Sequence, residues 1–159
     1  DRVAANRAAI VDDLAKYSGS DLVCYRADAP VELVRRQGAA WDRWLEWAGE
    51  RFGARLAVTT GVTHVSQSED ALERLRGAIA LHDNHRLVAL HAGITITGSA
   101  VLGLAFAAGA IGADDVLAAA EVDAAYQAEL WGRDAEAETA RANRLAELKA
   151  AEAYLKLLG

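Results

Sequence analysis

Methionine is absent from the 159 residues, and cysteine and proline each occur once. A single cysteine excludes a disulfide framework and a zinc site built from cysteines. A single proline excludes a Pro-rich linker and a collagen-like repeat. Because a reading frame begins with methionine, we expect that an upstream portion of the protein precedes Asp1.

Positive charge is also scarce, above all toward the end of the chain. The net charge is −6; residues 114–159 hold 10 acidic and 5 basic side chains, whereas residues 1–113 hold 13 and 12. Nucleic-acid binding needs a Lys/Arg patch that neutralises phosphates, so we expect no nucleic-acid partner. An acidic last third is easier to reconcile with a protein partner that is basic or apolar.

Alanine is abundant and β-branched runs are short, which predicts a mainly α fold. With 53% apolar and 25% charged residues, we expect one ordered domain over residues 1–159. We expect five to six helices and a small β ribbon made by residues of about 21–27 and 56–65. The expected helices cover 2–17, 30–52 with a stop at Gly53, a segment from a Ser66–Glu69 capping box to about His82, 87–113, 114–131, and 134–158.

Residues 87–113 contain no charged side chain, and a run of this length is long enough to span a bilayer. Polar residues dilute its hydrophobicity, however, and no aromatic belt flanks it. We therefore expect no membrane insertion and predict one buried central helix. Ser99, Gly103 and Ala107 form a ridge of small residues that lets another helix approach closely.

The helix expected over 30–52 carries an apolar stripe and three tryptophans. Trp41, Trp44 and Trp47 sweep around more than one of its faces. They are explained either as core residues with one partly exposed ring or as an exposed aromatic anchor for a partner. The stripe consists of Val34, Trp41, Leu45, Ala48 and Phe52.

The chain lacks a phosphate-binding loop, a dinucleotide fingerprint and a nucleophile elbow, so we expect neither an enzyme nor a cofactor. The rival hypothesis is a metal- or small-molecule-binding helical protein that uses His82, Asp83 and His85. On one helix, these two histidines would lie about one turn apart. Hydrogen bonds from helix-end histidines to the last carbonyls explain the same residues without a metal.

One helical face has the composition of an interface. It mixes carboxylate, aromatic, amide and apolar side chains, as partner-binding surfaces do. A solvated helix face that happens to contain a tyrosine is the equally weighted alternative. The face consists of Asp123, Tyr126, Gln127, Leu130 and Asp134.

Two long segments resemble a known family. Residues 21–53 (DLVCYRADAPVELVRRQGAAWDRWLEWAGERFG) resemble the opening signature of the assembly chaperones for the alpha subunit of the F-type ATP synthase, the Atp-twelve family. Residues 98–138 resemble its closing motif in the bacterial form, through Tyr126-Gln127, Trp131-Gly132 and Asp134-x-Glu136. The chain departs from the motif at Ala124, where a second acidic residue is expected beside Asp123.

The resemblance implies a two-part chaperone whose N-terminal β-rich domain is absent here and whose C-terminal helical part is this chain. Such proteins bind the unassembled alpha subunit and prevent its aggregation until the beta subunit replaces them, without hydrolysing nucleotide. A bacterial-type member would be cytoplasmic, whereas eukaryotic relatives act in the mitochondrial matrix. The resemblance links the carboxylates of the closing motif, Asp123, Asp134 and Glu136, to this role. The predicted partner-binding set adds the motif residue Trp131 and three residues of the helical face that we expect to contact the client, Tyr126, Gln127 and Leu130.

Overall fold

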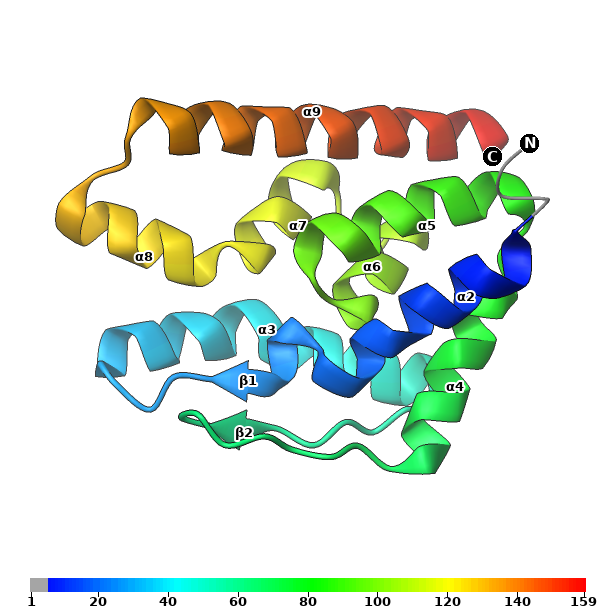
Figure 1. Cartoon of the computed structure of the whole chain (residues 1–159), viewed down its shortest axis with the longest axis horizontal. Helices are drawn as coiled ribbons and strands as arrows, with labels where there is room; N and C mark the ends of the chain where they lie inside the picture. Colours follow the sequence, from blue (N-terminus) through cyan, green and yellow to red (C-terminus); the bar gives the residue numbers. More distant parts are fainter. Residues whose placement is uncertain (1–5) are drawn as a thin grey trace.

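The structure is a computed structural model that describes residues 6–159, which contain eight α-helices and a two-stranded sheet. The helices surround a buried central helix, α6, and the longest of them, α9, runs across one side of the molecule (Figure 1). The prediction of a mainly α fold with a small β element is confirmed. The α-helices are α2 (Arg7–Ala15), α3 (Val31–Phe52), α4 (Glu69–Ala80), α5 (Asn84–Thr97), α6 (Ala100–Ala107), α7 (Ala113–Ala120), α8 (Val122–Trp131) and α9 (Ala135–Leu158).

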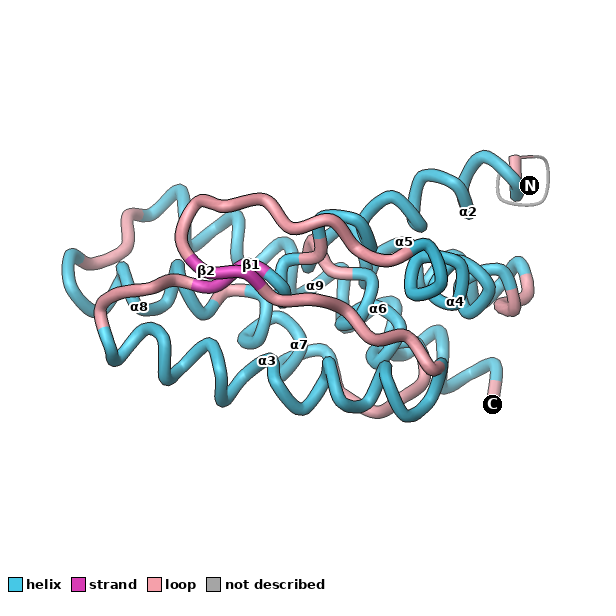
Figure 2. Tube along the Cα trace, turned by 90° about the horizontal axis from the view of Figure 1, so that it is seen from below, coloured by secondary structure: helices cyan, strands magenta, loops and turns pink. Residues whose placement is uncertain are grey.

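The sheet pairs β1 (Tyr25–Arg26) with β2 (Thr59–Thr60) in parallel, with Tyr25 opposite Thr59. Both strands lie beside α3, and β2 is flanked by long loops (Figure 2). The first β-prone stretch is only partly strand, because Leu22–Cys24 forms a short 3₁₀ helix ahead of β1. The ribbon is therefore smaller than predicted.

The first helix differs from its predicted span of 2–17 at its carboxyl end. Helix α2 ends at Ala15 and continues as a 3₁₀ helix over Lys16–Ser20. The part of the prediction that covers residues 2–5 lies outside the described residues.

Helix α3 ends at Gly53, whose φ of +69° is the left-handed conformation expected of a glycine C-cap. Its buried side differs from the predicted stripe, because Val34 is exposed and Leu33 faces the interior. The buried residues of α3 are Leu33, Gln37, Trp41, Trp44, Ala48 and Gly49.

The predicted central helix over 87–113 is in fact two helices, α5 and α6. Gly98 adopts a φ of +74° and ends α5, and the Ser99 hydroxyl then accepts the Leu102 N–H (3.0 Å) as the N-cap of α6. Every residue from Ala100 to Phe106 is buried, so the prediction of a buried centre is confirmed. No helix within residues 6–159 combines the length and apolarity needed to cross a membrane.

The predicted helix over 114–131 is also divided, at Glu121. This residue has φ −110° and ψ 25°, outside the helical region, and separates α7 from α8. Its carboxylate accepts hydrogen bonds from Arg141 (2.8 Å) and Arg144 on α9. The break between α7 and α8 therefore lies where two arginines of α9 bind the junction.

The N-cap of α4 is Ser68 rather than the predicted Ser66. The Ser68 hydroxyl accepts the Ala71 N–H at 3.1 Å, and Glu69 is already the first helical residue. The helix begins two residues late because Gln67 forms two hydrogen bonds with the backbone of Ala57 and thereby belongs to the preceding loop.

Candidate functional site

Helix α8 carries most of the predicted partner-binding residues, and it is exposed along its length. None of its residues over Val122–Trp131 is buried. It extends from the α7 junction toward the same end of the molecule as the start of α3, with α9 returning above it (Figure 1). A helix placed in this way offers its side chains to a partner without any change in the core.

The far end of α8 exposes apolar surface. Leu130 is 52% exposed and Trp131 is 76% exposed. Large aromatic side chains of this kind are enriched among residues that dominate binding at protein interfaces. Gln127 is exposed beside them, and Tyr126 is half-buried.

Asp123, at the other end of α8, is attached to α3. Its Oδ1 accepts a hydrogen bond from Gln37 Nε2 at 2.7 Å. Gln37 is buried, and its Oε1 accepts the Ala27 N–H at 2.8 Å. One amide thus joins the loop after β1, helix α3 and helix α8.

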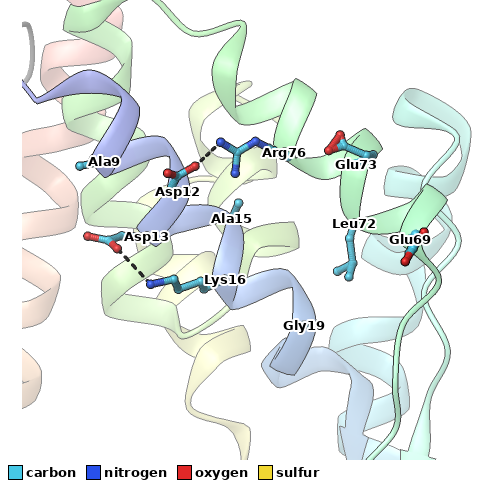
Figure 3. Close-up of a pocket in the computed structure, with 10 residues that line it drawn as sticks. All are labelled: Ala9, Asp12, Asp13, Ala15, Lys16, Gly19, Glu69, Leu72, Glu73 and Arg76. Atoms are coloured by element: carbon cyan, nitrogen blue, oxygen red, sulfur yellow. Dashed lines mark hydrogen bonds and ion pairs between the residues drawn. The ribbon is translucent and has the colours of Figure 1, made fainter.

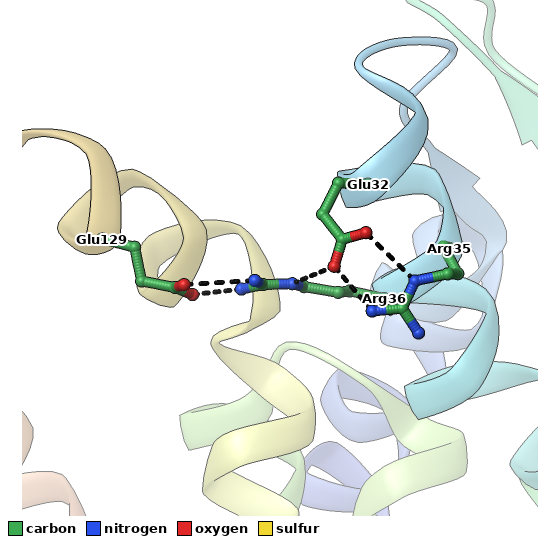
Figure 4. A network of polar contacts seen from close by, with 4 residues as sticks. All are labelled: Glu32, Arg35, Arg36 and Glu129. Atoms are coloured by element: carbon green, nitrogen blue, oxygen red, sulfur yellow. Dashed lines mark hydrogen bonds and ion pairs between the residues drawn. The ribbon is translucent and has the colours of Figure 1, made fainter.

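Arg36 makes the second attachment between α3 and α8 (Figure 4). Its guanidinium forms a two-pronged ion pair with Glu129 and a further bond with Glu32 at 3.0 Å. It also lies 5.3 Å from the centre of the Tyr126 ring, a cation–π distance. Hydrogen bonds from Arg35 and Arg36 lower the pKa of Glu32 to about 2, and the bond from Arg36 also lowers the pKa of Glu129.

Asp134 and Glu136 lie at the start of α9, after the turn that ends α8. The Asp134 carboxylate accepts the Ala137 N–H at 2.7 Å, so this residue is the N-cap of α9. Glu136 is exposed in the first turn, where a negative charge suits the helix dipole. Gly132 shapes the turn with φ +79° and ψ 175°.

The histidine cluster of the rival hypothesis is dispersed. His82 Nδ1 lies 2.9 Å from the Ala78 carbonyl at the end of α4, and His85 Nδ1 lies 2.9 Å from Tyr154 Oη on α9. Asp83 caps α5 by accepting the Arg86 N–H at 2.8 Å. Residues 6–159 contain no group of three His, Cys, Asp or Glu side chains placed to hold a metal ion. The structure therefore gives no support to the metal-binding alternative.

The tryptophans of α3 belong to the core. Trp41 is buried, and its Nε1 donates to the Ala119 carbonyl at 2.7 Å. Trp44 is buried as well, whereas Trp47 is half-buried and packs edge-to-face against Trp44 and Phe52. Of the two explanations of these rings, the structural one is confirmed.

A separate concavity of about 730 Å³ lies between α2 and α4 (Figure 3). Leu72 projects into it, and ion pairs occupy its walls, with Asp12 bound to Arg76 and Asp13 to Lys16. None of the predicted site residues lines this space. The exposed helix α8 is therefore the better candidate site.

Known chaperones match both the sequence and the fold. Residues 1–49 match the model of the ATP12 chaperone protein family. The crystal structure of Atp12 from Paracoccus denitrificans is 42% identical, covers 99% of this chain and superposes with a TM-score of 0.95. The chain belongs to the ATP12 family.

A second similar structure, a putative chaperone from Agrobacterium tumefaciens, is 38% identical, covers the whole chain and superposes with a TM-score of 0.93. The chain spans 67% of the length of the Paracoccus protein and 60% of that of the Agrobacterium protein. Because the matches cover nearly the whole chain, α8 belongs to the architecture shared with these ATP12-like structures.

The sequence prediction located the exposed side of α8 but missed the side-chain contacts that attach α8 to α3. Gln37, Arg36 and Glu129 are not among the predicted site residues, although they tie α8 to α3. A signal for Gln37 existed, since it lies four residues before Trp41 and therefore on the buried side of α3. A polar residue on such a stripe predicts a buried hydrogen bond.

Proposed function

We propose that this chain is the client-binding part of an assembly chaperone for the head of the F-type ATP synthase. It binds the unassembled alpha subunit, prevents its aggregation and gives way when the beta subunit takes its place. It acts as a non-enzymatic binding protein in the bacterial cytoplasm. Membership in the ATP12 family supports this proposal.

The observation that carries the proposal is the exposed α8 with its apolar end and acidic surroundings. Unassembled ring subunits expose interface surface that is apolar at its centre and polar at its rim. Leu130 and Trp131 match the apolar part, while Asp123, Asp134 and Glu136 supply charge around them. In this proposal Tyr126, Gln127 and Leu130 contact the alpha subunit, and the carboxylates set its orientation.

The test is light scattering by alpha subunit diluted from denaturant, with and without an equal concentration of this chain. We expect the chain to suppress scattering and the beta subunit to release the complex. Replacing both Asp123 and Asp134 with Lys should abolish the suppression. The changes remove the Asp123–Gln37 hydrogen bond and the N-cap of α9, which are local contacts of exposed residues, so the helical circular dichroism should stay close to that of the wild type.

The matched control replaces Glu46 and Glu50, two exposed residues of α3, with Lys. It changes the net charge by the same amount and lies outside the α8 surface. Asp134→Asn is a second control, because asparagine caps a helix as well as aspartate does and removes only the charge. If the Asp123/Asp134 variant still protects the alpha subunit, the α8 surface is the wrong one.

A further inference from the structure

Gln37 is a buried polar side chain whose two ends bind two different parts of the fold. Its Oε1 accepts the Ala27 N–H at 2.8 Å, and its Nε2 donates to Asp123 Oδ1 at 2.7 Å. It lies on the side of α3 that faces the core, next to the surface ion pair of Arg36. Both bonds are short and well within hydrogen-bond distance.

Chemistry leaves only one orientation for this amide. A backbone N–H can only donate and a carboxylate can only accept, so the Gln37 oxygen must face Ala27 and the nitrogen must face Asp123. The bond to Asp123 is charge-assisted. Removing the partner of a buried amide lowers the free energy of unfolding, because the amide N–H is then buried without a hydrogen bond. By contrast, Arg36 and Glu129 lie at the surface, where water and salt weaken an ion pair.

We infer that Gln37 is a positioning residue that holds Asp123, and through it helix α8, in the orientation that binds the client. The positional part of this inference stands on the two hydrogen bonds alone. Its consequence for client binding rests on the proposed function.

Two variants separate this role from a general effect on stability. Gln37→Glu keeps an acceptor for Ala27 but sets a second carboxylate against Asp123, which repels it. Adding Asp123→Asn to that variant reverses the hydrogen bond, because the new asparagine amide then donates to the carboxylate introduced at position 37. This double variant, Gln37→Glu with Asp123→Asn, is called the exchanged pair. It restores the contact between α3 and α8, with the donor now on α8 and the acceptor on α3.

Hydrogen–deuterium exchange of the α8 amides measures the position of the helix without any client. We expect Gln37→Glu to raise exchange over Val122–Trp131 by at least about tenfold, and the exchanged pair to return it to the wild-type rate. The scattering assay with alpha subunit, run on the same samples, should lose suppression with Gln37→Glu.

Gln67→Glu is the matched control, since Gln67 also bonds a backbone N–H and a carbonyl, those of Ala57, far from α8. It should leave α8 exchange unchanged. Unaltered α8 exchange in Gln37→Glu, or no recovery in the exchanged pair, would overturn the inference. If exchange changes as expected while wild-type chain fails to protect the alpha subunit, the positional inference holds and the proposed function fails.

Discussion

Asp21 is a fully buried carboxylate that organises the entry to the central helix. It accepts hydrogen bonds from the Ser99 hydroxyl (2.5 Å), the Val101 N–H (3.1 Å) and the Val23 N–H (3.3 Å). Burial raises the pKa of Asp21 to about 6, against the opposing effect of these hydrogen bonds. The carboxylate therefore joins two segments 80 residues apart while carrying a cost of desolvation.

This pKa predicts a pH dependence of stability. The pKa of the Asp21 carboxyl is 3.8 in the unfolded chain and about 6 in the folded protein, so the folded protein binds this proton more tightly. The resulting stabilisation is complete below the unfolded pKa and is lost as the pH rises through the folded pKa. Relative to Asp21→Asn, wild-type protein should gain about 1 kcal/mol in free energy of unfolding between pH 7 and pH 5. Denaturant titrations check this, and the exposed Asp13→Asn gives the baseline.

Single residues also show how far sequence reasoning reached at the candidate site. Asp123 and Leu130 were predictable because local helical spacing places them on one face, and Trp131 was indicated by the resemblance to the family's closing motif. The attachment of α8 through Gln37 and Arg36 was not predictable, because each bond joins residues that are far apart in the sequence. The separation is 86 positions for Gln37 and Asp123, and 93 positions for Arg36 and Glu129. Spacing within one helix carries no information about which distant helix lies beside it.

At the level of elements, α5 and α6 approach closely at Gly103, one of the small residues of the predicted ridge, although the prediction placed both segments in a single helix. A Cβ at Gly103 would lie 2.8 Å from the Ile94 backbone nitrogen and 3.0 Å from its Cα. Backbone cannot yield as a flexible side chain can, so Gly103→Ala forces the two helices apart.

We predict that Gly103→Ala lowers the free energy of unfolding by about 1–3 kcal/mol, the usual cost of overpacking. Gly77→Ala is the paired comparison, since no atom lies within 4 Å of a Cβ at that position in α4. It should raise the free energy of unfolding by about 0.5–1 kcal/mol through better helix propensity. Thermal or denaturant unfolding measures both, and equal effects of the two changes would contradict the close approach.

The two unpredicted helix breaks have tertiary causes. Asp21 supports the start of α6 after Gly98, and Arg141 and Arg144 from α9 hold Glu121 at the end of α7. Glycine at position 98 was a visible local signal, whereas nothing next to Glu121 marks a break. Six expected helices thus became eight over residues 6–159, with the fold class unchanged.

On the scale of the whole molecule, stability and the candidate binding surface reside in different parts. Two buried clusters form the core of the described chain, one around Trp41, Phe106 and Leu148 and the other around Leu75 and Leu90. Helix α8 contributes no buried residue over Val122–Trp131. Changes at its end should therefore affect binding without unfolding the body.

We predict that replacing Leu130 and Trp131 with Ser shifts the melting temperature by less than about 2 °C, because exposed substitutions change stability little. Suppression of alpha-subunit scattering should fall strongly, since these side chains offer the apolar contact area. Leu81→Ser with Val62→Ser removes two highly exposed apolar residues elsewhere and serves as the control. Loss of suppression by the control pair, or full suppression by the α8 pair, would count against the proposal.

Gly132 has a consequence for how this surface can evolve. Its combination of φ +79° and ψ 175° is accessible in practice to glycine alone, although a Cβ there would meet no neighbouring atom. Most exposed positions accept many different residues during evolution. Position 132 is restricted to glycine by its own backbone conformation rather than by any contact. The glycine thereby keeps α8 and α9 in their relative directions, and with them the spacing between the candidate binding residues at the end of α8 and the start of α9.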